Sequence, residues 1–98
     1  MKLISEIQIT PIKPKNGLIA FTSFVLFESF YLSSIGIMTR LNGGYRLLYP
    51  TKKINFKQIS LFYPINKSTS RQIEEEVIKT YEKVMNNDRY YLNNNTTK

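Results

Sequence analysis

Residues 18–39 form a long apolar stretch, LIAFTSFVLFESFYLSSIGIMT, in which Glu28 is the only charged residue. This length is sufficient for a helix that crosses a bilayer. However, a carboxylate at the centre costs roughly 2.5–3.5 kcal/mol on insertion, and Ser and Thr residues dilute the apolar content. The apolar residues are mainly β-branched and aromatic, which favours strands. We therefore predict two β-strands and no membrane span.

The two strands are predicted at Leu18–Phe27 and Phe30–Arg40, with a hairpin turn at Glu28-Ser29. Side chains alternate between the two faces of a strand. One face of the first strand then carries Ile19, Phe21, Val25 and Phe27, and the other carries Leu18, Ala20, Phe24 and Leu26. A strand with one face in water alternates apolar with polar residues. Both faces of this strand are apolar, so both need to be covered.

Three further segments extend the pattern into a β-meander. An opening strand is predicted at Ile4–Ile12, and it ends near two prolines. The Asn42-Gly43-Gly44 run predicts a tight hairpin turn, because Asn-Gly readily takes the positive φ angles that such turns need. This turn leads into a strand at Tyr45–Tyr49, and a weaker strand follows at Phe56–Tyr63.

A single helix is predicted after the strands. Thr69 is the expected N-cap, with Gln72 three residues later to complete a capping box. One apolar stripe then recurs at helical spacing and is expected to face the core: Ile73, Val77, Tyr81 and Val84. From Asn86 onward the chain is polar and rich in asparagine, so we expect residues 86–98 to be a frayed tail, in which Tyr90, Tyr91 and Leu92 are a candidate anchored patch.

These elements define an α+β fold, an antiparallel β-meander of four to five strands followed by one C-terminal amphipathic helix. Residues 1–85 are expected to form one domain, because 98 residues are too few for two independent cores. One helix covers only one face of such a sheet. The apolar residues on the other face therefore predict a homodimer that forms through the sheet.

The net charge of +7 lies entirely in residues 1–67, since residues 68–98 are neutral overall. A basic sheet portion beside a neutral helix favours a polyanionic partner. The chain has no Cys and no His, which excludes disulfides, zinc–thiolate sites and thiol catalysis and removes the commonest general base. The adjacent Glu74, Glu75 and Glu76 point in different directions on a helix. We expect no enzyme, no metal and no cofactor, and the N-terminal sequence lacks signal-peptide features, which favours a cytoplasmic location.

Several stretches lie in an order that resembles the SpoVG (stage V sporulation protein G) family of small bacterial nucleic-acid-binding regulators. They are Phe30–Ile37, Tyr49-Pro50-Thr51-Lys52-Lys53, Tyr63-Pro64-Ile65-Asn66 and the helical spacing of Ile73, Val77 and Tyr81. The resemblance covers roughly residues 1–84. Tyr63 stands where the family has histidine, the turn after the lysine pair is shortened to about Ile54-Asn55, and two extra residues precede Tyr63.

The resemblance implies a homodimer that binds DNA or RNA in a regulatory role. Lys52 and Lys53 match the basic pair of the family and are expected to contact phosphates from a loop. Arg71 is offset by one position from the family's arginine, which aligns with Ser70. Charge alone adds Lys57, Arg40 and Arg46, of which the two arginines flank the Gly43-Gly44 turn and are expected to form an arm along a nucleic-acid backbone.

Base stacking is a further expectation for three tyrosines that lie between basic residues: Tyr45, Tyr49 and Tyr63. For each of them the favoured alternative is a strand residue that packs with its hydroxyl at the edge of the core. A second hypothesis for the whole chain is a protein-interaction module, or an inhibitor of a host system encoded by a mobile element, on the same dimeric scaffold. It would bind another protein through the altered loop and the tail.

Overall fold

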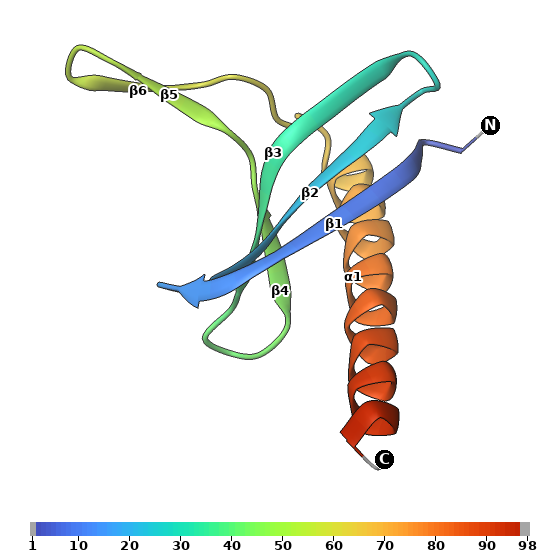
Figure 1. Ribbon diagram of the computed structural model, residues 1–98. Helices are drawn as coiled ribbons and strands as arrows, with labels where there is room; N and C mark the ends of the chain where they lie inside the picture. The colour runs from blue at the N-terminus through green and yellow to red at the C-terminus, as the bar shows by residue number, and fades with distance from the viewer. Residues whose placement is uncertain (1, 97–98) are drawn as a thin grey trace.

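The computed structural model describes the backbone of residues 2–96 and the side chains of residues 2–86. Its elements in chain order are β1 (Ile4–Lys15), β2 (Leu18–Leu26), β3 (Phe30–Thr39), β4 (Tyr45–Leu48), β5 (Thr51–Ile54), β6 (Lys57–Ser60) and α1 (Lys67–Thr96). Strands β1–β4 form an antiparallel sheet in sequence order, and β5 pairs only with β6. Figure 1 shows α1 beside one face of the sheet and the β5–β6 ribbon projecting from its body. The predicted α+β class is confirmed.

The β2–β3 hairpin confirms that the apolar stretch folds into two strands. Its turn lies at Phe27-Glu28, one residue earlier than predicted, and both residues have positive φ, 52° and 56°. The Ser29 N–H donates to the Leu26 carbonyl at 2.9 Å. Positive φ at both central residues matches the right-handed twist of the strands that the turn joins. Across the described residues, no helix has the length and apolar character needed to cross a bilayer.

The two faces of β2 differ in burial. Ala20 and Phe24 are fully buried, whereas Phe21 on the other face is 39% exposed. The predicted position of Leu18 beside Ala20 is wrong, because the β2–β3 register is irregular between these two residues. A Cβ on Gly36 would point to the face away from the helix and would lie 2.8 Å from the Leu18 side chain. Leu18 therefore packs on that face, and Ile19 contacts the core instead. This irregularity exchanges the faces of two neighbouring residues.

The connection between β3 and β4 is longer than the predicted tight turn. Five residues, 40–44, separate the strands, and positive φ occurs at Gly43 and Gly44 but not at Asn42. The Gly43 N–H donates to the Arg40 carbonyl, and the Arg40 N–H donates to the Gly44 carbonyl. The chain therefore reverses where predicted, but the two glycines alone take the left-handed conformation, which costs them little.

The predicted meander breaks after β4. Lys52 and Lys53, predicted in a loop, lie on β5, and the strand predicted at Phe56–Tyr63 is β6, which ends at Ser60. The two strands are joined by a two-residue turn at Asn55-Phe56, with a φ of 58° at Asn55. Pro50 has no N–H for a sheet ladder, so β4 cannot simply continue through it. The chain instead leaves the sheet and forms a separate ribbon, closed at its base by the Leu61 N–H bonded to the Pro50 carbonyl.

The core lies between α1 and one face of the sheet. Its buried helix residues are Ile73, Val77 and Tyr81, as predicted, and its sheet side comprises Ile4, Ala20, Phe24, Ile35, Ile37 and Leu47. The stripe continues through Met85 at the same four-residue spacing, whereas Val84 is half-buried beside it. The prediction of Val84 as the next core residue is therefore wrong.

The start of α1 differs from the predicted one. The helix begins at Lys67, and the Asn66 side-chain oxygen accepts a hydrogen bond from the Thr69 N–H at 3.0 Å. Asn66 is therefore the N-cap, and Thr69 is the capped residue. Asparagine ranks at least as high as threonine at this position. The backbone of α1 continues through Thr96, so the predicted tail at 86–98 begins within the helix. The side chains of residues 87–98, including the predicted Tyr90–Leu92 patch, lie outside the described residues, and fraying of the tail stays a prediction.

Burial in this core predicts a clear difference between two identical substitutions. Ile37 is fully buried and Ile65 is 93% exposed. We expect Ile37→Val to lower the free energy of unfolding by about 0.5–1.5 kcal/mol and Ile65→Val to change it by less than about 0.5 kcal/mol. Urea unfolding at one protein concentration measures both, and equal effects would contradict the described core.

The capping contact predicts a second pair of outcomes. We expect Asn66→Ala to destabilise the protein by about 1 kcal/mol, because it removes the acceptor for the Thr69 N–H. Thr69→Ala leaves that contact intact and places a better helix former in the first turn, so no loss is expected. Thermal unfolding followed by circular dichroism at 222 nm compares the two variants. The reverse order of stability would support the cap at Thr69 instead.

Candidate nucleic-acid interface

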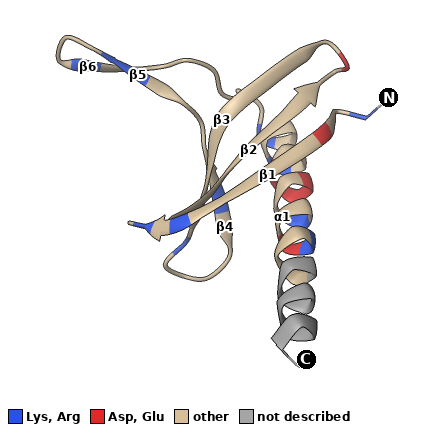
Figure 2. Cartoon of the chain, in the orientation of Figure 1, with Lys and Arg blue, Asp and Glu red and all other residues tan. Residues whose placement is uncertain are grey.

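The β5–β6 ribbon, residues 51–60, is here termed the arm. Every residue of β5 and β6 is exposed. The arm carries Lys52, Lys53 and Lys57 and no acidic residue. Figure 2 shows its basic residues away from the acidic ones, which lie along α1 beyond its first turn, at the start of β1 and at the β2–β3 turn. The structure thus brings three of the six predicted basic residues onto one projecting element.

The strand pairing divides the arm into two unlike faces. Lys52 pairs with Ile59, and Ile54 pairs with Lys57. Directly opposed residues share a face, and neighbouring residues along a strand point to opposite faces. One face therefore carries Lys52, Ile54, Lys57 and Ile59, which we term the isoleucine face. The other carries Thr51, Lys53, Gln58 and Ser60, which we term the polar face. Lys52 and Lys53 consequently point in opposite directions.

Arg40 and Arg46, the two arginines expected to form an arm along a nucleic-acid backbone, lie on different sides of the protein, and their contact with nucleic acid stays a prediction. The Arg40 guanidinium lies 3.3 Å from a Glu74 carboxylate oxygen on α1, and its Nε donates to the Tyr45 carbonyl at 3.0 Å. These contacts tie Arg40 to the helix and to its own loop. Arg46 is exposed on β4 opposite Met38, on the sheet face away from α1. Arg71 is exposed on α1 and so lies on a different element from the arm.

Two of the three tyrosines predicted to stack on bases are partly buried and pack against other aromatic rings. The Tyr45 ring meets the Tyr81 ring edge-on, with centroids 5.4 Å apart, and the Tyr49 ring meets Phe62 in the same way at 6.1 Å. Tyr63 remains 59% exposed. Sequence reasoning missed Phe56, which is 99% exposed at the tip of the arm. The sequence offers one indication that Phe56 lies in an exposed turn: it stands between Asn55 and Lys57, directly after a residue suited to a turn.

Burial also changes the ionisation of Tyr49. Its hydroxyl is enclosed and has no hydrogen-bond partner among the residues that the structure describes. Burial, and to a smaller extent the negative charge of Glu74, raises the pKa of Tyr49 to about 12. This burial fits the alternative given for Tyr49, a strand residue packed at the edge of the core.

An apolar depression, here termed the apolar groove, lies where the β2–β3 hairpin, the chain flanking the arm and the start of α1 meet. Its volume is about 320 Å³, and its lining includes Phe27, Phe30, Leu32, Phe62 and Tyr63. Its walls are almost entirely apolar. Within the described part of the chain, no three acidic side chains lie close enough together to hold a metal ion.

Comparison with known families agrees with the resemblance noted from the motifs. The model of the SpoVG family matches residues 1–83, which include the whole sheet, the arm and the buried turns of α1. The chain therefore belongs to the SpoVG family. No curated protein matches the chain.

The raised pKa of Tyr49 predicts a loss of stability at high pH. The neutral phenol is favoured in the folded state, so its contribution is complete below the ordinary tyrosine pKa of about 10 and is lost as pH rises through about 12. We expect Tyr49→Phe to lessen this loss and to cost no stability at pH 7, because the removed hydroxyl has no described partner. Urea unfolding at pH 7, 10 and 11.5 tests both statements. An unchanged pH profile in the variant would show that Tyr49 is not responsible.

Proposed function

We propose that this protein is a non-catalytic, homodimeric regulator in the cytoplasm that binds DNA or RNA, with the arm as its main phosphate-contacting element. The observation that carries the proposal is the arm itself, an exposed ribbon with three lysines and no acid. Membership of the SpoVG family supports the same function.

The two-faced arrangement of the lysines suits a ribbon that enters a groove. A two-stranded β-ribbon fits the major groove of B-form DNA, where phosphates line both walls. Lys52 and Lys57 point to one side of the arm and Lys53 to the other. Contacts of this kind release counterions and position the protein, and they discriminate little between sequences.

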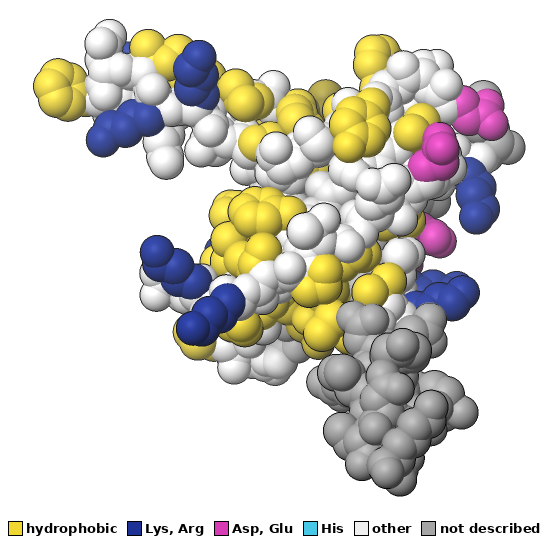
Figure 3. All heavy atoms as spheres, in the orientation of Figure 1, with side chains coloured by type: hydrophobic (Ala, Val, Ile, Leu, Met, Phe, Trp, Pro, Cys, Tyr) yellow, Lys and Arg dark blue, Asp and Glu magenta, His cyan; other side chains and the backbone are white. Residues whose placement is uncertain are grey.

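The homodimer is supported by apolar residues that one chain leaves uncovered. On the side of the sheet away from α1, Phe21 is 39% exposed and Leu48 is 44% exposed. Figure 3 shows hydrophobic side chains gathered there, below the arm. Exposed apolar groups that gather on one side of a small domain favour association. A dimer would also present two basic arms to one polyanion.

The alternative of a protein-interaction module has one observation in its favour. Phe56 at the tip of the arm is 99% exposed, and Leu61 just beyond β6 is 56% exposed. Apolar side chains in such positions gain more from a protein surface than from phosphates. Under this alternative the arm inserts into another protein, and nucleic-acid binding is absent.

Fluorescence anisotropy with labelled single- and double-stranded oligonucleotides, at two salt concentrations, tests the proposal. We expect the native chain to bind, with an affinity that falls steeply with salt. Lys52→Ala/Lys53→Ala is expected to weaken binding to all sequences alike. It should also reduce the slope of log K against log salt by about 1 for each phosphate that the variant no longer neutralises.

The matched control is Lys79→Ala/Lys83→Ala, which removes the same charge from two exposed lysines of α1. If binding depends on the arm and not on total charge, this control should bind much more tightly than the arm variant. Equal losses in both variants would contradict the arm as the interface. No salt-sensitive binding by the native chain, even at low salt, would reject the nucleic-acid function and favour the protein-interaction module.

A further inference from the structure

We propose that the face of the sheet away from α1, here termed the open face, binds an unpaired base of the nucleic acid. The rings of Phe21 and Tyr31 are the stacking surfaces of this base site. The inference rests on the proposed nucleic-acid binding and adds a contact to bases, where the arm contacts phosphates. It predicts that the protein binds single strands or unpaired segments more tightly than it would by phosphate contacts alone.

Two β-bulges shape the open face beside the middle of β2. Strand β1 has one extra residue opposite residues 23–25 of β2, and strand β3 has one extra residue opposite residues 22–24. Each bulge contains a residue with positive φ, Glu6 at 50° and Ser34 at 64°. Bulges bend a strand and redirect its side chains, and they are frequent next to functional sites. Both neighbours of β2 are therefore distorted at nearly the same level.

A depression of about 400 Å³, here termed the polar depression, lies beside these bulges. This volume is within the range of roughly 300–1,000 Å³ that is typical of small-ligand pockets. Most of its lining residues carry a hydroxyl or an amide. Five of these side chains make no hydrogen bond to other described residues: Gln8, Thr10, Ser23, Ser33 and Ser34. Hydroxyl and amide groups both donate and accept hydrogen bonds, so they suit the polar edge of a nucleobase.

Two exposed rings complete the lining of the polar depression. Tyr31 on β3 pairs with Val25 on β2, and Val25 lies four residues after Phe21 and so shares its face. Both rings therefore belong to the open face, where Phe21 is 39% and Tyr31 is 68% exposed. Aromatic side chains on the surface of a four-stranded sheet are a common platform for unpaired bases. Stacking on them tolerates every base, because every base has a π-face.

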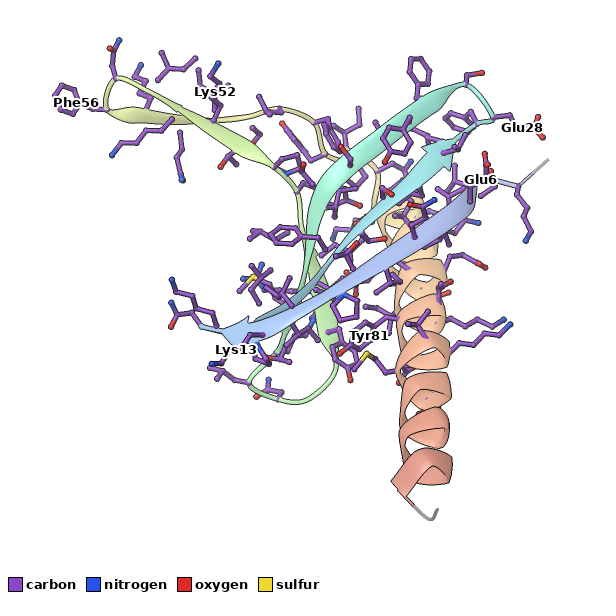
Figure 4. All side chains as sticks on the ribbon, viewed as in Figure 1. Glu6, Lys13, Glu28, Lys52, Phe56 and Tyr81 are labelled. Carbon is purple, nitrogen blue, oxygen red and sulfur yellow. The ribbon has the colours of Figure 1, made fainter. Side chains whose placement is uncertain are left out.

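The distribution of cations favours a base over a neutral sugar in the polar depression. The lysines of the arm lie on one side of the open face, Lys13 and Lys15 lie at the end of β1, and Arg46 lies on the open face itself. Figure 3 shows Lys and Arg side chains above and below the hydrophobic side chains of this region. Figure 4 shows the labelled Lys52 and Lys13 well separated, on the arm and at the end of β1. A polyanion that contacts both groups crosses the open face and brings its bases to the polar depression.

The base site leaves part of the open face to the proposed homodimer. Leu48 lies on the edge strand β4, outside the lining of the polar depression. Phe21 lies between the two areas, because its partner Gly36 also pairs with Leu48. The base and the second copy can therefore divide the open face between them. A test that changes Phe21 needs to include the oligomeric state.

Tyr31→Trp tests the contact directly, because the chain has no tryptophan of its own. At saturation, we expect a single-stranded oligonucleotide to quench the indole fluorescence and an abasic strand of the same length and charge to leave it unchanged, since only bases stack on the ring. The control is Leu41→Trp, which places the indole on the exposed β3–β4 loop. Quenching that is absent, or that is equal in the control or with the abasic strand, would overturn the base site.

The affinities of intact variants supply the second measurement. We expect the native chain to bind the single strand at least about 5-fold more tightly than the abasic strand, the lower limit of what one base–aromatic stack contributes. Phe21→Leu/Tyr31→Leu should abolish this ratio and leave duplex binding unchanged. Phe56→Leu, which removes an exposed ring from the arm, should leave the ratio intact. Loss of the ratio in Phe56→Leu alone would place the stack on the arm and not on the open face.

The nucleic-acid function and the base site are rejected by different results. No salt-sensitive binding of any oligonucleotide by the native chain rejects both. Salt-sensitive binding with equal affinity for the single strand and the abasic strand rejects the base site alone. In sedimentation velocity, we expect Phe21→Leu/Tyr31→Leu to match the native chain in oligomeric state. A change of that state together with loss of the base preference would assign the two rings to the dimer interface and overturn the base site.

Discussion

The packing of one helix stripe against one sheet face is the interaction on which the rest of this structure depends. Val77 and Phe24, both fully buried, lie at its centre, and Ile35 and Ile37 complete the sheet side. In a chain of 98 residues without disulfides, burial of these side chains is the main source of stability. The hairpin turn at Phe27-Glu28 and the cap at Asn66 set where the two partners of this contact begin and end.

The same contact explains why much of the apolar surface stays exposed. A single helix covers one face, so the opposite face of β2 and β3 remains open to solvent within one chain. The arm adds to the exposed apolar surface, because it leaves the sheet at Pro50 and takes Ile54, Phe56 and Ile59 away from the core. In the proposed homodimer, a second copy would cover part of this surface.

Sequence reasoning was accurate where one local pattern had one structural solution. The stripe of Ile73, Val77 and Tyr81 has helical spacing and is buried as predicted. Sequence reasoning was wrong where two local structures were both compatible with the same residues. Thr69 and Asn66 are both good caps, and only the position of the chain after Pro64 selects Asn66. The Lys52-Lys53 pair is polar enough for a loop, yet it forms a strand because residues 57–60 are available to pair with it.

The sequence alone determined the α+β class, the apolar hairpin, the core face of the helix and the family to which the chain belongs. Periodicity and spacing are local properties, so they can be read along the chain. The tertiary structure decided where the cations and the exposed aromatic side chain lie. It paired Arg40 with Glu74, placed Lys52 and Lys53 on opposite faces of a ribbon and set Phe56 at its tip. These outcomes depend on strand register and on contacts between residues far apart in sequence, which no local pattern encodes.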